Sequence, residues 1–234
     1  MKKIALLLII STIFIYANWN LYPTYPRYLQ KSKDVLSMFF FKANTDQKIV
    51  ALTFDDGPNR YTPKIMKVLQ QNQAPATFFL VAKKLTKKYD YLYNNPLFTP
   101  AMHTFSHKKF DKLTTKQIEA DFQKAIANFK KHHLNYDLFR PAYGVVNKRL
   151  ASILQQKRIV PILWSNDTKD WNKRRKNYKR VIDKLSSGDI ILMHDHATTP
   201  KELDRLIKNI RAKGFTIVPV KELLNYPSSF PIKL

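Results

Sequence analysis

Cysteine is absent from this chain of 234 residues, and its absence excludes several kinds of protein at once. Disulfide-stapled scaffolds, thiolate catalysis and cysteine-ligated zinc all need a residue type that the chain lacks. Any metal ion in this protein must therefore be held by histidine, aspartate or glutamate side chains. A hydrophobic fraction of 44% indicates a folded globular chain, and the length suits one domain of moderate to large size.

Acidic residues are also few. The chain has 17 aspartates and glutamates and 41 lysines and arginines, which gives a net charge of +24. Such a charge favours anionic partners, which could be nucleic acid, acidic lipid or an acidic cell-wall polymer. A basic surface that only keeps the protein soluble is the alternative.

A hydrophobic run long enough to span a bilayer comfortably is missing as well. Lys2 and Lys3 precede the apolar run Ile4–Ala17, which falls short of the roughly 20 residues that a spanning helix needs. A short basic segment before such a run is typical of an export signal, but no clean cleavage site follows it. Residues 1–17 are therefore expected to be a cleaved signal peptide or an uncleaved signal anchor, and a buried helix is the alternative. Export would turn the positive charge toward the cell surface and disfavours nucleic acid as a partner.

The rest of the chain divides into three parts. Residues 18–45 are aromatic and basic with little periodicity, and we interpret them as a juxtamembrane connector. Strand and helix patterns alternate over 46–226, which predicts parallel strands with helices outside, and 227–234 form a tail. Strands are expected at 48–54, 76–82, 159–164, 189–193 and 215–218, with helices around 62–69, 114–129, 147–154, 181–185 and 203–210. In such a fold the loops after the strands share one face, where catalytic groups usually gather.

Two adjacent carboxylates, Asp55 and Asp56, directly follow the first expected strand. They repel each other unless a cation or a hydrogen-bond donor relieves them. Because neighbouring side chains diverge, one can bind a metal while the other faces a bound water. Taken alone, the pair could equally form a turn or a helix cap.

Two histidines four residues apart, His103 and His107, are the second candidate group. This spacing predicts that both lie on one side of a helical turn and can reach one ion. Together with Asp56 they would give a set of two histidines and one carboxylate, which suits zinc or a similar divalent ion with open positions. Two ordinary surface histidines are the alternative.

Three further polar groups are candidates, and two of them, Asp170 and His194, follow expected strands. Arg140 can hold a carboxylate by paired hydrogen bonds, although a surface arginine before a turn would show the same pattern. Asp170 lies in the segment 167–171, which could be a solvated loop. His194 can donate a proton if a carboxylate orients it, although a lone histidine is more often structural.

In their order along the chain, these segments resemble the five motifs of the polysaccharide deacetylases of carbohydrate esterase family 4. The motifs are TFDDGP at 53–58, HTFSH at 103–107, RPAYG at 140–144, DTKDW at 167–171 and LMHD at 192–195. The resemblance implies an α/β fold that is a distorted, incomplete (β/α) barrel. It also implies a hydrolase that removes acetyl groups from an N-acetylglucosamine-containing polysaccharide.

The resemblance assigns a metal site and a general base. Asp56, His103 and His107 would hold a divalent ion, with zinc expected and cobalt or a similar ion as the alternative. Asp55 would act as general base on a water molecule, and Arg140 would orient Asp55.

The resemblance also assigns an acid and an acetyl pocket. The backbone N–H of Tyr143 would stabilise the oxyanion, and His194 would protonate the leaving amine. Asp170 would orient His194 and favour its charged form. Trp171 and Leu192 would line a small pocket for the acetyl methyl group.

Two segments near the motifs are unusual. The stretch before His103, Pro96–Met102, is shorter than its family counterpart and lacks glycine, so we expect an atypical loop that changes the approach to His103. The basic run Lys173–Lys176, with Lys179 and Arg180, follows Trp171 and is expected near the active-site face. We hypothesise that it holds the protein on a polyanionic wall, and a solvated helix start is the alternative.

Two classes of function stay open at this point. The first is an active deacetylase of cell-wall peptidoglycan, with exported poly-N-acetylglucosamine or chitin oligomers, and then an acetyl ester on xylan, as alternative substrates. The second is a non-catalytic wall-binding protein on the same fold, and the presence of both Asp55 and His194 argues against it. We expect an extracytoplasmic protein, secreted or anchored by its N-terminal segment. Its expected partners are an N-acetylated polysaccharide, anionic wall polymers and, if the segment is uncleaved, the membrane, but not nucleic acid.

Overall fold

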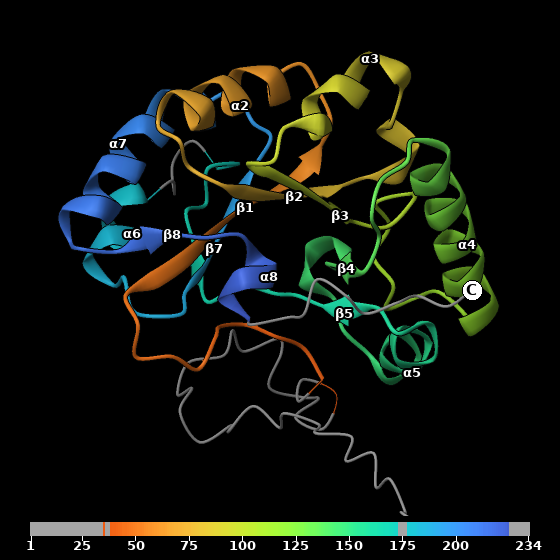
Figure 1. The fold of residues 1–234 in the computed structure, drawn as a ribbon. Helices are drawn as coiled ribbons and strands as arrows, with labels where there is room; N and C mark the ends of the chain where they lie inside the picture. Colours follow the sequence, from red (N-terminus) through yellow and green to blue (C-terminus); the bar gives the residue numbers. More distant parts are fainter. Residues whose placement is uncertain (1–34, 36–37, 173–176, 225–234) are drawn as a thin grey trace, which may run out of the picture.

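Parallel β-strands form the centre of the molecule in the computed structural model, which describes residues 35, 38–172 and 177–224 (Figure 1). The strands of the described part follow the order β5-β4-β3-β2-β1-β7-β6, and β8 pairs with the start of β1. All of these pairings are parallel. The strands are β1 (Ile49–Gly57), β2 (Ala76–Leu80), β3 (Phe98–Met102), β4 (Leu138–Phe139), β5 (Val160–Pro161), β6 (Asn166–Asp167), β7 (Ile190–His194) and β8 (Thr216–Ile217).

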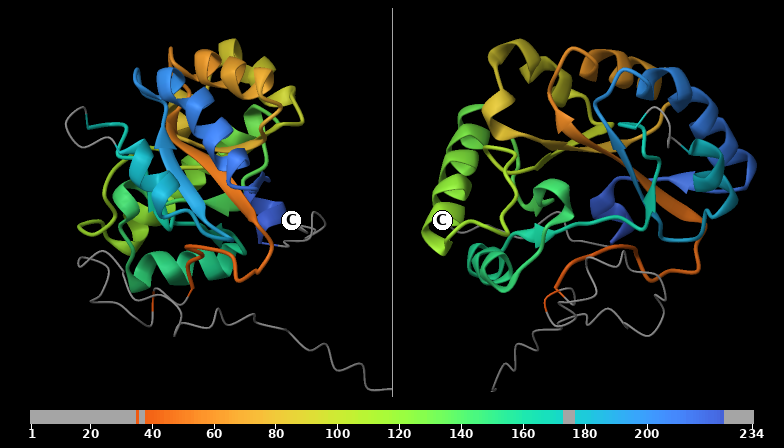
Figure 2. Two further views of the ribbon diagram at one scale, coloured as in Figure 1. Left: turned by 90° about the vertical axis from the view of Figure 1, so that its left-hand side faces the viewer. Right: turned by 180° about the vertical axis from the view of Figure 1, so that it is seen from behind.

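Helices cover the outside of this curled sheet, as the two views in Figure 2 show. The sheet does not close into a full barrel, because its two end strands, β5 and β6, are not paired with each other in the described part. The structure therefore confirms the expected distorted, incomplete (β/α) barrel. The longer helices are α2 (Thr62–Gln71), α4 (Thr115–Lys131), α5 (Lys148–Lys157), α6 (Tyr178–Asp183) and α7 (Thr199–Ala212). Shorter ones are η3 (Ala82–Lys84), α3 (Lys87–Asp90), η4 (Tyr91–Asn94), η5 (Ala142–Gly144) and α8 (Val220–Leu223).

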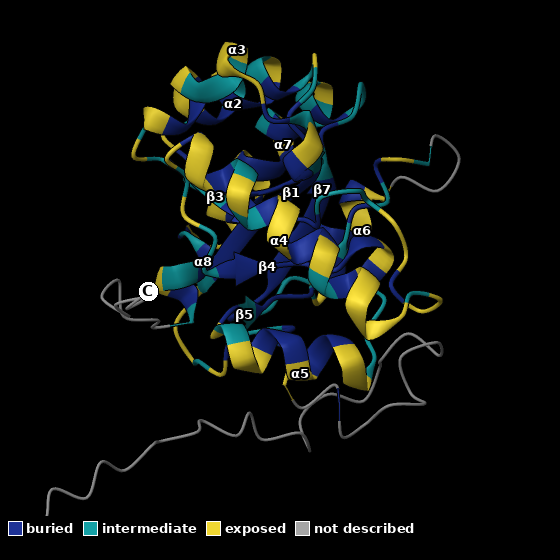
Figure 3. Cartoon of the chain, turned by 90° about the vertical axis from the view of Figure 1, so that its right-hand side faces the viewer, coloured by how far each residue is buried: buried dark blue, intermediate teal, exposed yellow. Residues whose placement is uncertain are grey.

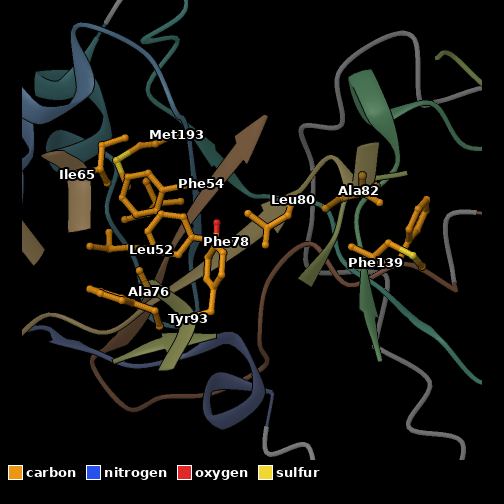
Figure 4. Close-up of a cluster of buried hydrophobic side chains, with 14 of the residues drawn as sticks. Leu52, Phe54, Ile65, Ala76, Phe78, Leu80, Ala82, Tyr93, Phe139 and Met193 are labelled. Carbon is orange, nitrogen blue, oxygen red and sulfur yellow. The ribbon is translucent and has the colours of Figure 1, made fainter. Parts of the chain in front are cut away.

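Strand β1 lies in the middle of the sheet, and its alternating side chains serve two cores. Leu52 and Phe54 face the helices and join the larger core cluster, in which Phe54 stacks on Phe78 with ring centroids 5.0 Å apart (Figure 4). Burying each such side chain stabilises the fold by about 1.5–3 kcal/mol. Ala51 points the other way, into a second cluster on the opposite face of the sheet. Because side chains alternate along a strand, Asp55 lies on the same side as Ala51 and points into the curl of the sheet.

Two helix starts expected from the sequence, near residues 114 and 147, are confirmed with their capping residues, whereas α6 and α7 begin before the expected 181 and 203. Thr114 caps α4 by accepting a hydrogen bond from the backbone N–H of Gln117, and the Gln117 side chain returns the bond to complete a capping box. Asn147 caps α5 by accepting from the backbone N–H of Leu150 at 2.9 Å. These caps fix the positions of the helices that support the loops after β3 and β4.

The segment before His103 is a strand and not the atypical loop that we expected. Residues 98–102 form β3, which pairs with β2 over its whole length, from Ala76 opposite Phe98 to Leu80 opposite Met102. Its other neighbour, β4, pairs only at Met102, so the missing N–H of Pro100 lies where one side of the strand is unpaired. The strand therefore tolerates proline and delivers His103 directly to the edge of the sheet.

Other boundaries also differ from the prediction. Strand β1 continues to Gly57, so Asp55 and Asp56 end the strand instead of following it, with a register shift between Asp55 and Gly57. The expected strand at 159–164 shortens to β5, and an unexpected strand, β6, follows it and pairs with β7. Two-residue strands carry too little pattern to be recognised in a sequence.

The end of the expected connector is part of the folded domain. Phe40 donates its N–H to the carbonyl of Pro161 at 2.9 Å and accepts a bond from the N–H of Leu163 at 2.7 Å. Ala43 likewise donates to the carbonyl of Gly188 at 2.9 Å. The expected signal segment 1–17, the basic run 173–176 and the tail 227–234 lie outside the described residues. No helix within the described ranges is long and apolar enough to cross a membrane.

Candidate active site

The motif residues converge at the carboxyl ends of the strands, around a cavity of about 460 Å³. Asp55 and Asp56 end β1, His103 follows β3, and His194 ends β7. Parallel strands carry their following loops to the same edge of the sheet, which explains why residues far apart in sequence meet here. The cavity is lined by Asp55, Asp56, His103, His107, Tyr143, Gly144, Trp164, Asp167, Trp171, Leu192 and His194.

Asp56, His103 and His107 form a group that can hold a metal ion, since one ligand atom from each lies within 4.8 Å of the others. The Oδ1 atom of Asp56 is 2.8 Å from Nε2 of His107 and 3.5 Å from Nε2 of His103. On its other side, His103 has Nδ1 2.8 Å from the carbonyl oxygen of Arg140. A proton on Nδ1 donated to that carbonyl leaves the Nε2 lone pair free for a metal, which is the usual arrangement of a metal-bound histidine. The donor set therefore fits a divalent ion such as zinc.

The charge of Asp56 is strongly favoured in this position. Burial alone would raise the pKa of Asp56, but hydrogen bonds from His103 and His107 outweigh it and hold the pKa well below its ordinary value. The carboxylate is therefore ionised at any physiological pH, as a metal ligand must be.

The two histidines lie on a loop and not on the helical turn that their spacing predicted. Thr104 and His107 have φ of 64° and 58°, which no α-helix contains. The loop is held instead by Asp121 of α4, whose carboxylate accepts the backbone N–H of Phe105 at 2.7 Å and of Ser106 at 3.1 Å. Sequence reasoning missed Asp121, although a buried carboxylate on the apolar face of a helix was the signal that could have found it.

Asp55 is fixed by Arg140, whose side chain is fully buried. Nη1 of Arg140 donates to Oδ1 of Asp55 at 2.7 Å and to the hydroxyl of Thr53 at 2.8 Å. Nη2 donates to the carbonyl of Leu163 at 2.8 Å, and the guanidinium lies 4.0 Å from the centroid of the Phe79 ring. A buried charge must be paired and hydrogen-bonded, and here one network meets both requirements. The second oxygen of Asp55 stays directed toward the cavity, with Oδ2 3.8 Å from Nε2 of His103.

His194 is fixed in the same way by Asp170. Nδ1 of His194 lies 2.8 Å from Oδ1 of Asp170, and the backbone N–H of His194 donates to Oδ2 of Asp170 at 2.7 Å. The hydroxyl of Thr199 donates to the same oxygen at 2.6 Å. Burial alone would lower the pKa of His194, but the hydrogen bond and charge of Asp170 outweigh it and raise the pKa to about 9, with Asp55 and Asp56 adding to the effect. His194 is therefore protonated at neutral pH.

Two half-exposed aromatic rings stand at the mouth of the cavity. Trp171 is 51% exposed and Tyr143 is 53% exposed, whereas Leu192 lies buried between the strands. The ring of Tyr143 packs on His107, with centroids 4.8 Å apart. The structure thus brings all ten residues expected at the site to the cavity or into direct contact with a residue that lines it.

Strained backbone is concentrated in the motifs. Eight non-glycine residues of the described part have positive φ, and three of them, Gln73, His133 and Arg158, follow helices. The other five lie in the motif segments, namely Asp56, Thr104, His107, Tyr143 and Lys169. Such conformations cost about 1–3 kcal/mol each and persist where the surroundings over-determine them, which is typical of functional sites.

Behind the site, Asp195 ties β7 to β1, a contact that sequence reasoning missed. Its backbone N–H donates to the carbonyl of Asp55 at 2.9 Å, and the hydroxyl of Thr62 donates to its buried carboxylate. Burial raises the pKa of Asp195 to about 7, although the bond from Thr62 opposes this shift. A Cβ atom on Gly57 would come within 2.5 Å of Oδ2 of Asp195, so a larger residue there would displace this buried carboxylate.

Comparisons with known proteins agree with this geometry. The family model for polysaccharide deacetylases matches residues 42–162, just over half of the chain. A peptidoglycan-N-acetylglucosamine deacetylase of Bacillus cereus is 29% identical over 210 residues, which cover 85% of this chain and 98% of that relative. The peptidoglycan-N-acetylglucosamine deacetylase PgdA of Listeria monocytogenes is 33% identical over 193 residues, which cover 78% of this chain and 40% of that relative.

One similar solved structure is a mutant of a carbohydrate esterase family 4 pseudoenzyme with restored enzymatic activity. It is 26% identical with a TM-score of 0.73, and the match covers 80% of this chain and 71% of that one. Fold and motif geometry together define a deacetylase-type hydrolase. The chain belongs to the polysaccharide deacetylase family.

Proposed function

We propose that this protein hydrolyses the acetamido group of N-acetylglucosamine in bacterial peptidoglycan, releasing acetate and leaving a free amine on the glycan. The observation that carries the proposal is that a carboxylate and a histidine, each held by a buried partner, face each other across one cavity. Asp55 on β1 and His194 on β7 are direct partners in the register of neighbouring strands. Each is oriented by a buried partner of opposite charge, Arg140 or Asp170.

Asp55 is the general base in this proposal. Arg140 occupies one oxygen of Asp55 and leaves the other facing the cavity, where it can accept a proton from an attacking water. A divalent ion held by Asp56, His103 and His107 would lower the pKa of a bound water and polarise the acetyl carbonyl. Zinc suits this donor set, with cobalt or a similar ion as the alternative.

His194 is the general acid. Its Nδ1 is bonded to Asp170, so Nε2 is the nitrogen that can deliver a proton to the leaving amine. The backbone N–H of Tyr143 supplies a donor for the oxyanion of the tetrahedral intermediate, and the positive φ of this residue, 60°, sets the direction of its peptide groups. Trp171 and Leu192 would enclose the acetyl methyl group, which favours acetyl over longer acyl chains.

Peptidoglycan is the substrate that the named relatives favour. The relatives from Bacillus cereus and Listeria monocytogenes both carry the name of a peptidoglycan-N-acetylglucosamine deacetylase. We further propose an extracytoplasmic location, with residues 1–17 as a signal peptide or membrane anchor, because a basic start precedes an apolar run. The net charge of +24 supports association with anionic wall polymers.

Acetate release from purified cell wall tests the proposal. The wild type loaded with Zn²⁺ is expected to release acetate, and Asp55→Asn is expected to lose about 10²–10⁴-fold in rate, since it removes the base. The variant keeps the three metal ligands, so its metal content should equal that of the wild type. If wild type and Asp55→Asn release the same amount from peptidoglycan and from N-acetylglucosamine oligomers alike, the protein is a non-catalytic member of the family.

A further inference from the structure

Lysines surround the loop that carries the two metal-binding histidines. Lys83 donates to the carbonyl of Ser106 at 3.0 Å. Lys108 and Lys124 line a hollow of about 360 Å³ next to this loop. Lys124 belongs to α4, a helix with many exposed residues (Figure 3). Lys109 lies on the cavity side, with Nζ 5.0 Å from the centroid of the Tyr143 ring.

These lysines carry positive charge that the described residues do not neutralise. Within the described ranges, no carboxylate lies at ion-pair distance from Lys108, Lys109 or Lys124, whereas Lys42, Lys179, Lys208 and Lys221 are the described lysines with such a pair. The one carboxylate that lines the hollow belongs to Asp121. Both of its oxygens already accept hydrogen bonds from the loop.

Lys109 is connected to the metal site through a single side chain. The Tyr143 ring has Lys109 on it and also packs on the ring of His107, 4.8 Å away. A cation–π contact at an exposed site contributes about 0.5–1 kcal/mol, which positions the ammonium group without using up its hydrogen-bond donors. An anion bound by Lys109 would therefore lie at the rim of the cavity, next to a sugar that occupies it.

We propose that Lys109, together with Lys108 and Lys124 beside the adjoining hollow, binds carboxylates of the peptide attached to the glycan strand. This inference rests on the proposed deacetylation of peptidoglycan. It adds that the enzyme recognises the peptide carboxylates of its substrate. A neutral N-acetylglucosamine polymer has no group for these lysines. Only the Tyr143 ring separates Lys109 from His107, so a carboxylate on the strand that carries the reacting sugar can reach Lys109. The lysines thus select peptide-bearing glycan over neutral polysaccharide.

Three substrates separate the outcomes. They are glycan strands with their peptides, the same strands with the peptide carboxyl groups amidated, and neutral N-acetylglucosamine oligomers. The test variants are Lys109→Gln and the triple variant Lys108→Gln/Lys109→Gln/Lys124→Gln. A matched triple variant removes three exposed lysines away from the loop, Lys130→Gln/Lys131→Gln/Lys213→Gln, and controls for the change in net charge.

On peptide-bearing strands at low salt, Lys109→Gln is expected to raise KM about threefold and the triple variant about tenfold, with kcat unchanged, since exposed ion pairs are individually weak. Amidation of the substrate or added salt should raise the wild-type KM in the same way and remove the difference between the enzymes. Neutral oligomers and the matched control should show no change.

An equal loss on neutral oligomers, or an unchanged KM on peptide-bearing strands, would overturn the inference. So would competition by a phosphate polymer combined with indifference to amidation, because the lysines would then serve a different anion. If the wild type deacetylates none of the three substrates, the proposed function fails instead.

Discussion

Asp55 and Asp56 are neighbours in the chain, yet the fold gives them opposite surroundings. Asp55 faces the buried guanidinium of Arg140, whereas Asp56, with φ of 72°, turns toward His103 and His107. Two like charges at adjacent positions are tolerated because each has its own cationic or hydrogen-bonding partners. One segment of strand can therefore supply a metal ligand and a base.

Replacing Asp170 by asparagine should move the pH dependence of activity. In its proposed role as the acid, His194 must be protonated, so activity is expected to fall as the pH rises through about 9. Asp170→Asn removes the charge that raises this pKa, and the alkaline limb of kcat/KM should shift to lower pH. Protonated His194 also contributes to the free energy of unfolding. Because its pKa is raised, this contribution is fully present below the ordinary pKa of 6.5 and is lost as the pH rises through about 9. An exposed control, Asp183→Asn, should leave the profile in place, and an unmoved limb in Asp170→Asn would refute the assignment.

A substitution at Gly144 tests how tightly the wall of the cavity is packed. It has φ of 66°, and a Cβ atom there would come within 2.8 Å of the Trp164 indole. Gly144→Ala is expected to lower the free energy of unfolding by about 1–3 kcal/mol. Gly214→Ala is the matched control, because Gly214 also has a positive φ, 79°, but its Cβ would meet only the Lys48 side chain at 3.8 Å. Denaturant unfolding of both variants measures the difference, and equal losses would show that the clash has no effect.

At the scale of whole elements, helix α4 supports the metal site from outside the sheet. Asp121 accepts two backbone N–H groups of the loop between His103 and His107, so it sets the positions of both proposed ligands although it is not one of them. The capping box of α4 fixes where the helix begins and therefore where Asp121 lies relative to the loop.

Removing that support should weaken metal binding. Asp121→Ala is expected to lower metal affinity about 10–100-fold, the usual effect of losing a group that orients a ligand. Gln123→Ala changes an exposed residue of the same helix and serves as the control. Isothermal titration of the metal-free proteins with Zn²⁺ measures both, and an unchanged affinity in Asp121→Ala would contradict the role of this carboxylate.

Elements with strong local pattern could be predicted from the sequence, and elements defined by tertiary pairing could not. Strand β1 and helices α4 and α5 lie close to the ranges expected from their hydrophobic patterns. Strand β3 was missed because Pro100 argues against a strand, and only its one-sided pairing makes proline acceptable there. The helical turn expected for the histidines was wrong because a spacing of four residues fits a helix and an irregular loop equally well.

The candidate site could be predicted further than the fold around it. All ten expected residues lie at or against one cavity, since strand ends in a parallel sheet meet at one edge. Asp121 and Asp195 were missed as contributors because their roles depend on which loop or strand packs against them. Whether a carboxylate pairs with a lysine such as Lys109 likewise depends on the three-dimensional structure and cannot be read from the sequence.

At the scale of the whole molecule, the net charge of +24 should govern the proposed association with an anionic cell wall. Binding to purified wall is expected to be strong at low salt and to weaken progressively as NaCl approaches about 1 M, where charges are screened within about 3 Å. Wall stripped of its anionic polymers is the control and should retain less protein at low salt. Retention that ignores both salt and stripping would show that another interaction holds the protein.

Mass spectrometry of muropeptides tests the proposed deacetylation of N-acetylglucosamine in peptidoglycan. Purified wall is treated with the Zn²⁺-loaded protein or with Asp55→Asn, digested with a muramidase, and each fragment is assigned to its sugar. If the proposed function is correct, the wild type removes acetyl groups from N-acetylglucosamine and leaves N-acetylmuramic acid intact, whereas Asp55→Asn changes neither. Loss of acetyl groups from muramic acid alone, or identical spectra for the two proteins, would contradict it.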